Sequence, residues 1–132
     1  MDTHDIAWAA GIYEGEGYFS WHRGYPVVSV EMTDKDIIDR IKSIFPSRSG
    51  KRSVMERRNR DSIMGNPRKD TFRYELHGTS AIIAMQMLLP FMGERRSIRI
   101  IEIIKVWRST PYYLSPGFNK SSPGFGANRR NV

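Results

Sequence analysis

The sequence predicts an α+β domain in which one antiparallel sheet carries helices on one of its faces. Residues 18–22 and 71–77 alternate apolar and polar side chains with the period of a half-buried strand. Residues 33–45 instead carry isoleucines at helical spacing. The 132 residues are enough for one compact domain or one subunit of an oligomer. We expect the domain to cover residues 1–108 and to be followed by an extended or flexible C-terminal tail over residues 109–132.

The first helix is expected to run to about Glu14, with Thr3 or Asp2 as its capping residue. Gly15-Glu16-Gly17 should end this helix, which leaves Glu16 just beyond the C-terminus. The glycines on both sides supply bends in the backbone and leave the Glu16 carboxylate open.

Two hairpins are predicted, one on each side of the second helix. In the first hairpin, a turn at residues 24–26 joins the strand over residues 18–22 to a returning strand over residues 27–32. In the second, a polar loop over residues 59–70 joins a weakly patterned strand at residues 51–58 to the strand that follows the loop. Together the two hairpins predict a four-stranded antiparallel sheet.

Three further helices complete the predicted order α-β-β-α-β-β-α-α. Thr33 followed by Asp36 resembles a capping box and should open a helix that ends near Phe45. The third helix is expected over residues 78–89, where a proline ends it, and the fourth over residues 97–108.

The predicted sheet has one polar face that no helix covers. Such a face is often only solvated surface, but it can also read base edges in a DNA groove. The side chains expected on it, and expected to contact DNA, are Ser20, His22, Ser29, Glu31, Arg73, Glu75 and His77.

The positive charge is concentrated in the centre and the C-terminal half of the chain. Residues 1–47 carry a net charge of −4, residues 48–73 carry +6 and the remainder carries +5, which sum to the net +7. A solvated arginine-rich loop would look similar, but arginines interleaved with Ser and Asn favour phosphate binding, because the guanidinium fork matches phosphate oxygens. The candidate DNA-binding residues of this segment are Arg48, Lys51, Arg52, Arg57, Arg58, Arg60, Arg68 and Lys69.

The composition also excludes several classes of protein. Cysteine is absent, which excludes disulfide frameworks, zinc fingers, Fe–S clusters and cysteine nucleophiles. The first residues carry acids and no Lys or Arg, unlike a secretory or mitochondrial signal, and the apolar runs are too short to span a bilayer. We therefore expect an intracellular protein without a membrane partner, in the cytoplasm or nucleoid or in an organelle with its own genome.

The first helix carries a stripe of small residues that could contact a second helix. Ala7, Ala10, Gly11 and Glu14 recur at i, i+3, i+4 and i+7, and small side chains at this spacing let two helix backbones approach closely. The commoner use of such a stripe is to pack a helix on its own sheet. A helix–helix contact would need a second copy of the chain, because the segment occurs once in the sequence.

Residues 8–19, WAAGIYEGEGYF, resemble the motif of the LAGLIDADG homing endonucleases. The nine letters of the motif fall on residues 9–17, and its two acids are Glu14 and Glu16. The hairpin, the helix, the second hairpin and the Leu-Pro-Phe stretch with basic residues after it follow in the order that the family shows. The resemblance covers roughly residues 5–108, and it implies a saddle-like four-stranded antiparallel sheet with helices on one face.

The resemblance also implies roles for individual residues. Glu16, as the second acid, would be catalytic and would bind Mg²⁺ or another divalent cation, with the carbonyl of Gly15 as a further ligand. Asp34 falls where the family often has a glutamine that holds the attacking water, although Asp34 equally suits the N-terminus of a helix. Arg95 falls where lysine is more typical, and arginine can stabilise charge on the phosphate but does not readily donate a proton.

The sequence therefore predicts a site-specific double-strand DNA endonuclease, linked to intron or intein mobility, that hydrolyses phosphodiesters with a divalent metal. With one motif per chain it should act as a homodimer through the motif helix, on a long pseudo-palindromic site. The departures at Asp34 and Arg95 leave open a non-cleaving nucleic-acid-binding protein on the same scaffold, such as a regulator or an intron-splicing maturase. A purely structural domain would show no salt-sensitive DNA binding.

Overall fold

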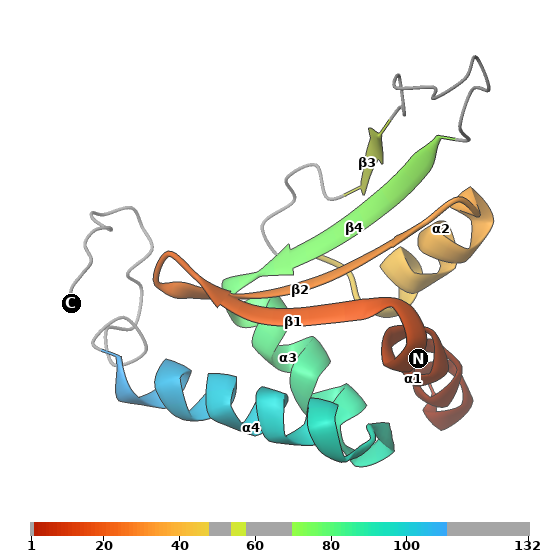
Figure 1. Cartoon of the computed structure of the whole chain (residues 1–132). Coiled ribbons are helices and arrows are strands. Elements are labelled where there is room, and N and C mark those ends of the chain that lie inside the picture. The colour runs from red at the N-terminus through yellow and green to blue at the C-terminus, as the bar shows by residue number, and fades with distance from the viewer. Residues whose placement is uncertain (1, 48–53, 58–69, 111–132) are drawn as a thin grey trace.

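The structure is a computed structural model that describes residues 2–47, 54–57 and 70–110. It shows a curved sheet with helices against one side (Figure 1), which confirms the predicted α+β class with an antiparallel sheet. The elements are, in chain order, α1 (Thr3–Glu16), β1 (Gly17–His22), β2 (Tyr25–Met32), α2 (Lys35–Ile44), β3 (Val54–Arg57), β4 (Thr71–His77), α3 (Gly78–Leu88), the 3₁₀ helix η2 (Leu89–Phe91) and α4 (Glu94–Ser109).

The strands pair in the order β1-β2-β4-β3, and each neighbouring pair is antiparallel. Val28 lies opposite Phe19 of β1 and Leu76 of β4, and Val30 lies opposite Tyr74. Because side chains alternate between the faces of a sheet, these five residues share one face, and all five are buried. The short strand β3 pairs with the outer edge of β4.

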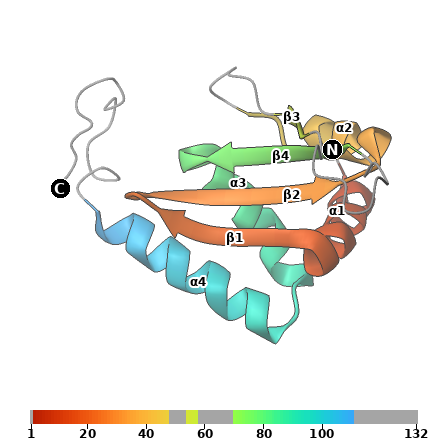
Figure 2. The same ribbon diagram turned by 45° about the horizontal axis from the view of Figure 1, so that its top comes forward.

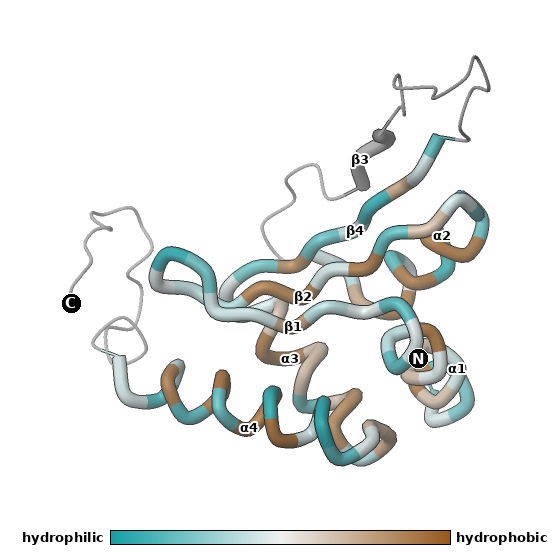
Figure 3. Tube along the Cα trace, viewed as in Figure 1, coloured by the Kyte–Doolittle hydropathy of each residue, from teal (hydrophilic) through white to brown (hydrophobic). Residues whose placement is uncertain are grey.

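The helices cover this apolar face, as Figures 1 and 2 show from two directions. Helix α3 crosses beneath the middle of the sheet, α4 runs alongside β1, and α2 packs at the other end against β4 and β2. Most residues of α3 itself are apolar (Figure 3). Such a composition is typical of a helix that is buried on most of its sides. In the part of the chain that the structure describes, no helix is long and apolar enough to cross a membrane.

Three of the predicted boundaries are wrong. Helix α1 extends through Glu16 instead of ending at Glu14, because β1 begins directly at Gly17. The N-cap of α2 is Asp34, whose side chain makes no capping hydrogen bond, so the predicted capping box at Thr33 does not form. Helix α4 begins at Glu94, about one turn earlier than predicted.

The start of α1 is capped as the sequence suggested, by Asp2. The Asp5 N–H donates to Asp2 Oδ1 at 2.9 Å, and the Asp2 N–H donates back to Asp5 Oδ2 at 3.4 Å. This reciprocal cap satisfies two N–H groups and puts negative charge at the positive end of the helix dipole. The other end of α1, which carries the motif acids, has no basic residue in its last turn.

Candidate active site and nucleic-acid interface

The junction between α1 and β1 fixes the position of Glu16. The Gly17 N–H donates to the carbonyl of Tyr13, which closes the last turn of the helix, and Gly17 itself is already in extended conformation. A Cβ at Gly17 would lie 2.6 Å from the Tyr13 carbonyl oxygen and 2.7 Å from Tyr13 Cδ1. Only glycine therefore lets the helix pass into the strand without a loop, and Glu16 is held between the two elements.

The carboxylate of Glu16 faces solvent. Glu16 and Gly15 are both exposed, and a Cβ at Gly15 would find no atom within 4 Å. Within the described ranges, the Glu16 side chain has no hydrogen bond or ion pair to another residue. A free carboxylate at the negative end of a helix is disfavoured, so a cation bound there would relieve the repulsion.

The donors at this end of α1 fit part of a divalent-cation site. The Glu16 carboxylate and the backbone carbonyls beside it are hard oxygen ligands, which Mg²⁺ and Ca²⁺ prefer. Across residues 2–47, 54–57 and 70–110, no group of three or more His, Asp or Glu side chains could hold a metal ion. The described residues of one chain therefore supply only part of a ligand set.

Glu14, the first acid of the motif, is engaged within its own chain. Its Oε1 accepts a hydrogen bond from the N–H of Gly93 at 2.7 Å, and its Oε2 lies 3.4 Å from Nε of Arg96. Glu14 therefore ties α1 to the start of α4.

The arginine that contacts the motif is Arg96, which was not predicted, and not the predicted Arg95. Arg95 is exposed, and among the described residues it has no hydrogen-bond or ion-pair partner. Arg96 Nε donates to the Glu14 carbonyl at 2.9 Å, and Arg96 Nη1 donates to the Gly17 carbonyl at 2.7 Å. A helical signal could have identified it, because Arg96 shares a helix face with the buried Ile100, Ile103 and Trp107.

Asp34 lies at the same end of the sheet as Glu16. Gly17 pairs with Val30, so the beginning of β1 lies beside the last residues of β2, and Asp34 follows β2 closely (Figure 1). The Asp34 side chain is exposed, while its backbone carbonyl accepts the Ile38 N–H at 3.3 Å. Of the predicted catalytic residues, Glu16 and Asp34 thus share one end of the sheet, and the Glu14–Gly93 bond brings the start of α4, with Arg95, to α1.

The small-residue stripe of α1 needs one correction. Ala10 was expected to face a second copy of the chain, but it is only 2% exposed and packs in the core of its own chain. Ala7, Gly11 and Glu14 are exposed, and their contact with a second copy stays a prediction. Together with Gly15, Ala7 and Gly11 form an exposed line at i, i+4 and i+8, so the surface that a second helix could approach is rotated away from Ala10.

The polar face of the sheet carries the residues that were expected to contact DNA. Tyr18, Ser29 and Glu75 form one cross-strand row, and Glu31 pairs with Arg73 in the next. Ser20 and Ser29 are each only 7% exposed, so a base edge could reach them only if neighbouring side chains moved. Tyr18 was not among the predicted contacts, but it is 62% exposed and lies on the same face as Ser20, two residues along the strand.

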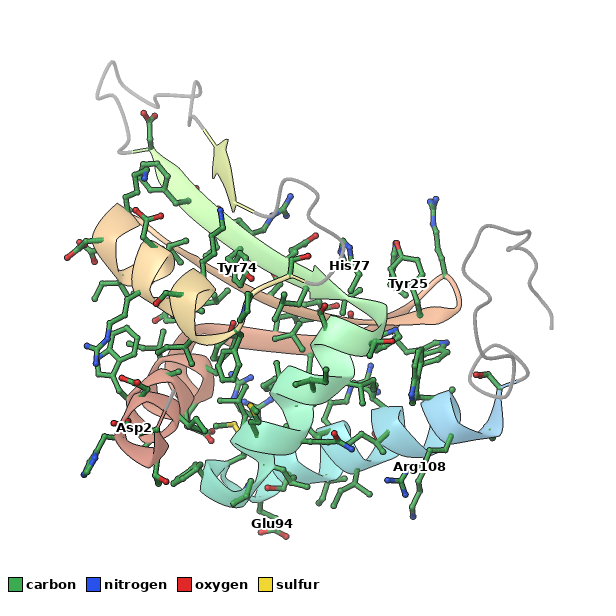
Figure 4. The ribbon with its side chains drawn as sticks, turned by 180° about the vertical axis from the view of Figure 1, so that it is seen from behind. Asp2, Tyr25, Tyr74, His77, Glu94 and Arg108 are labelled. Carbon is green, nitrogen blue, oxygen red and sulfur yellow. The ribbon has the colours of Figure 1, made fainter. Side chains whose placement is uncertain are left out.

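Hydrogen bonds and ring contacts connect the side chains of this face. Thr71 Oγ1 donates to Glu31 Oε2 at 2.6 Å, and the Glu75 carboxylate lies 3.7 Å from Arg73 Nε and 3.2 Å from His77 Nε2. The Tyr25 ring packs edge-on against His77 at 5.4 Å, on the side of the sheet away from α3 and α4 (Figure 4). Both signs of charge and several donors and acceptors are thus available on one surface.

Of the basic residues predicted in the 48–69 segment, the structure describes one. Arg57 is in β3, opposite Thr71. The remaining ones lie outside the described residues, namely Arg48, Lys51, Arg52, Arg58, Arg60, Arg68 and Lys69.

Comparison with known proteins gives a match of fold. No protein-family model matches the chain, and no curated protein matches it. The structure is similar to that of the homing endonuclease I-CvuI in complex with its target in the presence of 2 mM Ca, with a TM-score of 0.57 and 16% identity over 86% of this chain and 76% of that one. A second I-CvuI complex, with the I-CreI target, 2 mM Mg and uncleaved DNA, gives a TM-score of 0.51 and 14% identity over 81% and 70% of the two chains. The resemblance to the LAGLIDADG fold is therefore confirmed.

Proposed function

We propose that this protein is a site-specific double-strand DNA endonuclease that uses a divalent cation, with Mg²⁺ as the expected ion. The observation that carries the proposal is the placement of Glu16. Its carboxylate is exposed and unpaired among the described residues, at the end of a sheet whose open face is polar, in a fold similar to that of a DNA-bound homing endonuclease.

Each residue at this end of the sheet has a proposed task. Glu16 and the Gly15 carbonyl hold the cation, which when bound stabilises the charge that develops on a phosphodiester during hydrolysis. Asp34 orients a water molecule through its exposed carboxylate, and Arg95 offers positive charge to the phosphate. The polar face between Tyr18 and His77 contacts bases, while the basic residues of the 48–73 segment contact phosphates.

A second copy of the chain would complete the site. The described residues contain no full metal-ligand cluster, and the exposed line of Ala7, Gly11 and Gly15 permits the close approach of another α1. Such a homodimer would bring two Glu16 carboxylates together, and a cation between them would offset their repulsion. The target would then be pseudo-palindromic and about 20 base pairs long, with one helical turn per subunit.

The decisive variant is Glu16→Gln, which keeps the shape of the side chain and removes its charge. We expect it to bind target DNA within about threefold of the wild type and to lose cleavage by at least about 100-fold, the effect typical of a lost electrostatic contact in a transition state. A cleavage selection from a randomised pseudo-palindromic library supplies the target, and Mg²⁺-dependent linearisation of a plasmid carrying it supplies the assay. Glu102→Gln, an equal change of charge at an exposed position of α4, is the control.

Undiminished cleavage by Glu16→Gln would contradict the proposal. Wild-type protein that binds DNA with a steep dependence on salt, but yields no cleaved library member in Mg²⁺, would instead support a non-cleaving DNA-binding protein. The exposed, unpaired state of Arg95 and its replacement of the more typical lysine are the observations that favour this second function.

A further inference from the structure

The C-terminal end of α1 is held by a side chain from a distant part of the chain. α1 has no basic residue in its own last turn, where the free carbonyls give the helix its negative end. Arg96, about 80 residues further along, donates to the carbonyl of Glu14 at 2.9 Å and to that of Gly17 at 2.7 Å. These two carbonyls lie on either side of Gly15 and Glu16, the proposed metal ligands. Arg96 therefore binds the backbone immediately before and immediately after them.

The contact is reciprocal, because α1 in turn caps α4. The N-cap of α4 is Gly93, which has no side chain to accept from the first N–H groups of its helix. Glu14 from α1 instead accepts the N–H of this N-cap residue itself, at 2.7 Å through Oε1, and so puts negative charge at the positive end of the helix. Its other oxygen lies 3.4 Å from Arg96 Nε. Each helix thus places a charge of favourable sign at the end of the other: Arg96 at the end of α1, which has no basic residue of its own, and Glu14 at the start of α4, beside Glu94.

Most of the Arg96 side chain is shielded from solvent. Its side chain is 12% exposed, and its guanidinium carbon lies 5.9 Å from the ring centre of the buried Phe19 of β1. A charge-assisted hydrogen bond in partly buried surroundings is stronger than an exposed one, because less water competes for the donor. A lysine could place only one charged head where the guanidinium now reaches two carbonyls and a carboxylate.

We propose that Arg96 is a positioning residue, which holds the Glu14–Gly17 backbone so that the Glu16 carboxylate and the Gly15 carbonyl present their oxygens in one arrangement. The inference rests on the proposed function for its effect on cleavage. The lock itself, by which we mean the contacts of Arg96 with the carbonyls of Glu14 and Gly17, can be tested without that function. Arg96 acts through α1, whereas Arg95, one position earlier, points to solvent and is the residue proposed for the phosphate.

The test compares Arg96→Lys, Arg96→Gln and Glu14→Gln with Arg108→Gln, which removes the same charge from an exposed position at the far end of α4 (Figure 4). The readouts are the single-turnover cleavage rate at saturating protein, the Mg²⁺ concentration that gives half the maximal rate, the Kd for target DNA, and amide hydrogen exchange of Gly17 and Gly93. We expect Arg96→Lys to lower the maximal rate by about 10- to 100-fold, the cost of a displacement of about 1 Å. The half-saturating Mg²⁺ concentration should rise, exchange at both glycines should accelerate, and the Kd should stay within about threefold of the wild type.

Each alternative leads to a different result. If Arg96 only supplied positive charge to DNA, Arg96→Lys would keep activity and exchange protection, while Arg96→Gln would weaken DNA binding, and this pattern would overturn the proposal. If Arg96→Gln fails to fold, Arg96→Lys and Glu14→Gln still test the proposal, since both keep a long, charged side chain at position 96. If the wild type cleaves no DNA, the proposed function fails, and unchanged exchange at Gly17 and Gly93 in Arg96→Lys would separately refute the lock.

Discussion

Replacement of Gly17 by alanine tests whether the direct passage from α1 into β1 depends on the absence of a side chain. The added Cβ would lie 2.6 Å from the carbonyl oxygen of Tyr13, 2.7 Å from its Cδ1 and 2.9 Å from its Cα. Two of these three atoms belong to the backbone of a helix turn, and Tyr13 is fully buried. The neighbour therefore cannot give way by a simple rotation of its side chain.

The structure sets the size of the expected effect. Overpacking a closely packed site costs about 1–3 kcal/mol, and the rigid contact here favours the upper part of that range. Gly11→Ala is the matched control, since its Cβ would meet no atom within 4 Å. In the middle of an exposed helix it should instead stabilise the fold by up to about 1 kcal/mol through helix propensity. The two alanines should thus differ by about 2–4 kcal/mol in the free energy of unfolding.

Urea denaturation followed by circular dichroism measures both variants, at several protein concentrations so that folding is separated from association. We expect a lower midpoint for Gly17→Ala with an unchanged m-value, and the opposite shift for Gly11→Ala. If the two variants unfold within about 0.5 kcal/mol of each other, a spread ordinary for harmless surface changes, the steric account of the junction is refuted.

Two further variants test the core. Tyr13 Oη is buried and has no hydrogen-bond partner among the described residues, so Tyr13→Phe should stabilise the fold by about 1–3 kcal/mol. Burial raises the pKa of Tyr13 well above its usual range. Above about pH 10, therefore, only the unfolded chain releases this proton. The free energy of unfolding of the wild type should then fall by up to about 1.4 kcal/mol per pH unit, a loss that Tyr13→Phe should not show. Urea titrations between about pH 7 and 11 check both statements, and equal pH dependence of the two proteins would contradict the second. Leu88→Ala, at a fully buried position of α3, should cost about 2–5 kcal/mol, whereas Ile101→Ala, 42% exposed on α4, should cost less than about 1 kcal/mol, and equal midpoints would contradict the described core.

Local pattern was enough to predict the faces of the sheet. In residues 71–77, the apolar residues and the polar ones alternate, and the structure buries Tyr74 and Leu76 while Arg73 and Glu75 lie on the open face. The alternation of side chains between two faces is a property of the extended backbone itself, so it can be predicted without knowing what packs on the strand. The motif around Glu16 was visible for the same reason, since its residues are contiguous.

Contacts between distant segments were not available from pattern alone. Successive residues of a helix point about 100° apart, so whether Arg95 or Arg96 meets α1 depends on how α4 rolls against the sheet. For the same reason, pattern alone did not show that Ala10 packs in the core of its own chain while Gly11 is exposed.

By itself, the sequence determined the class of fold, the open face of the sheet and the acid placed at the end of the first helix, because periodicity and contiguous motifs are written into neighbouring residues. Only the tertiary structure decided that α1 runs into β1 through Gly17, that Glu14 and Arg96 cap each other's helices, and that Gly11 is exposed on α1 while Ala10 is buried. The contact between Glu14 and Arg96 joins segments about 80 residues apart. Which side chains of a helix are buried depends on how that helix is rotated against its neighbours, because successive residues point about 100° apart.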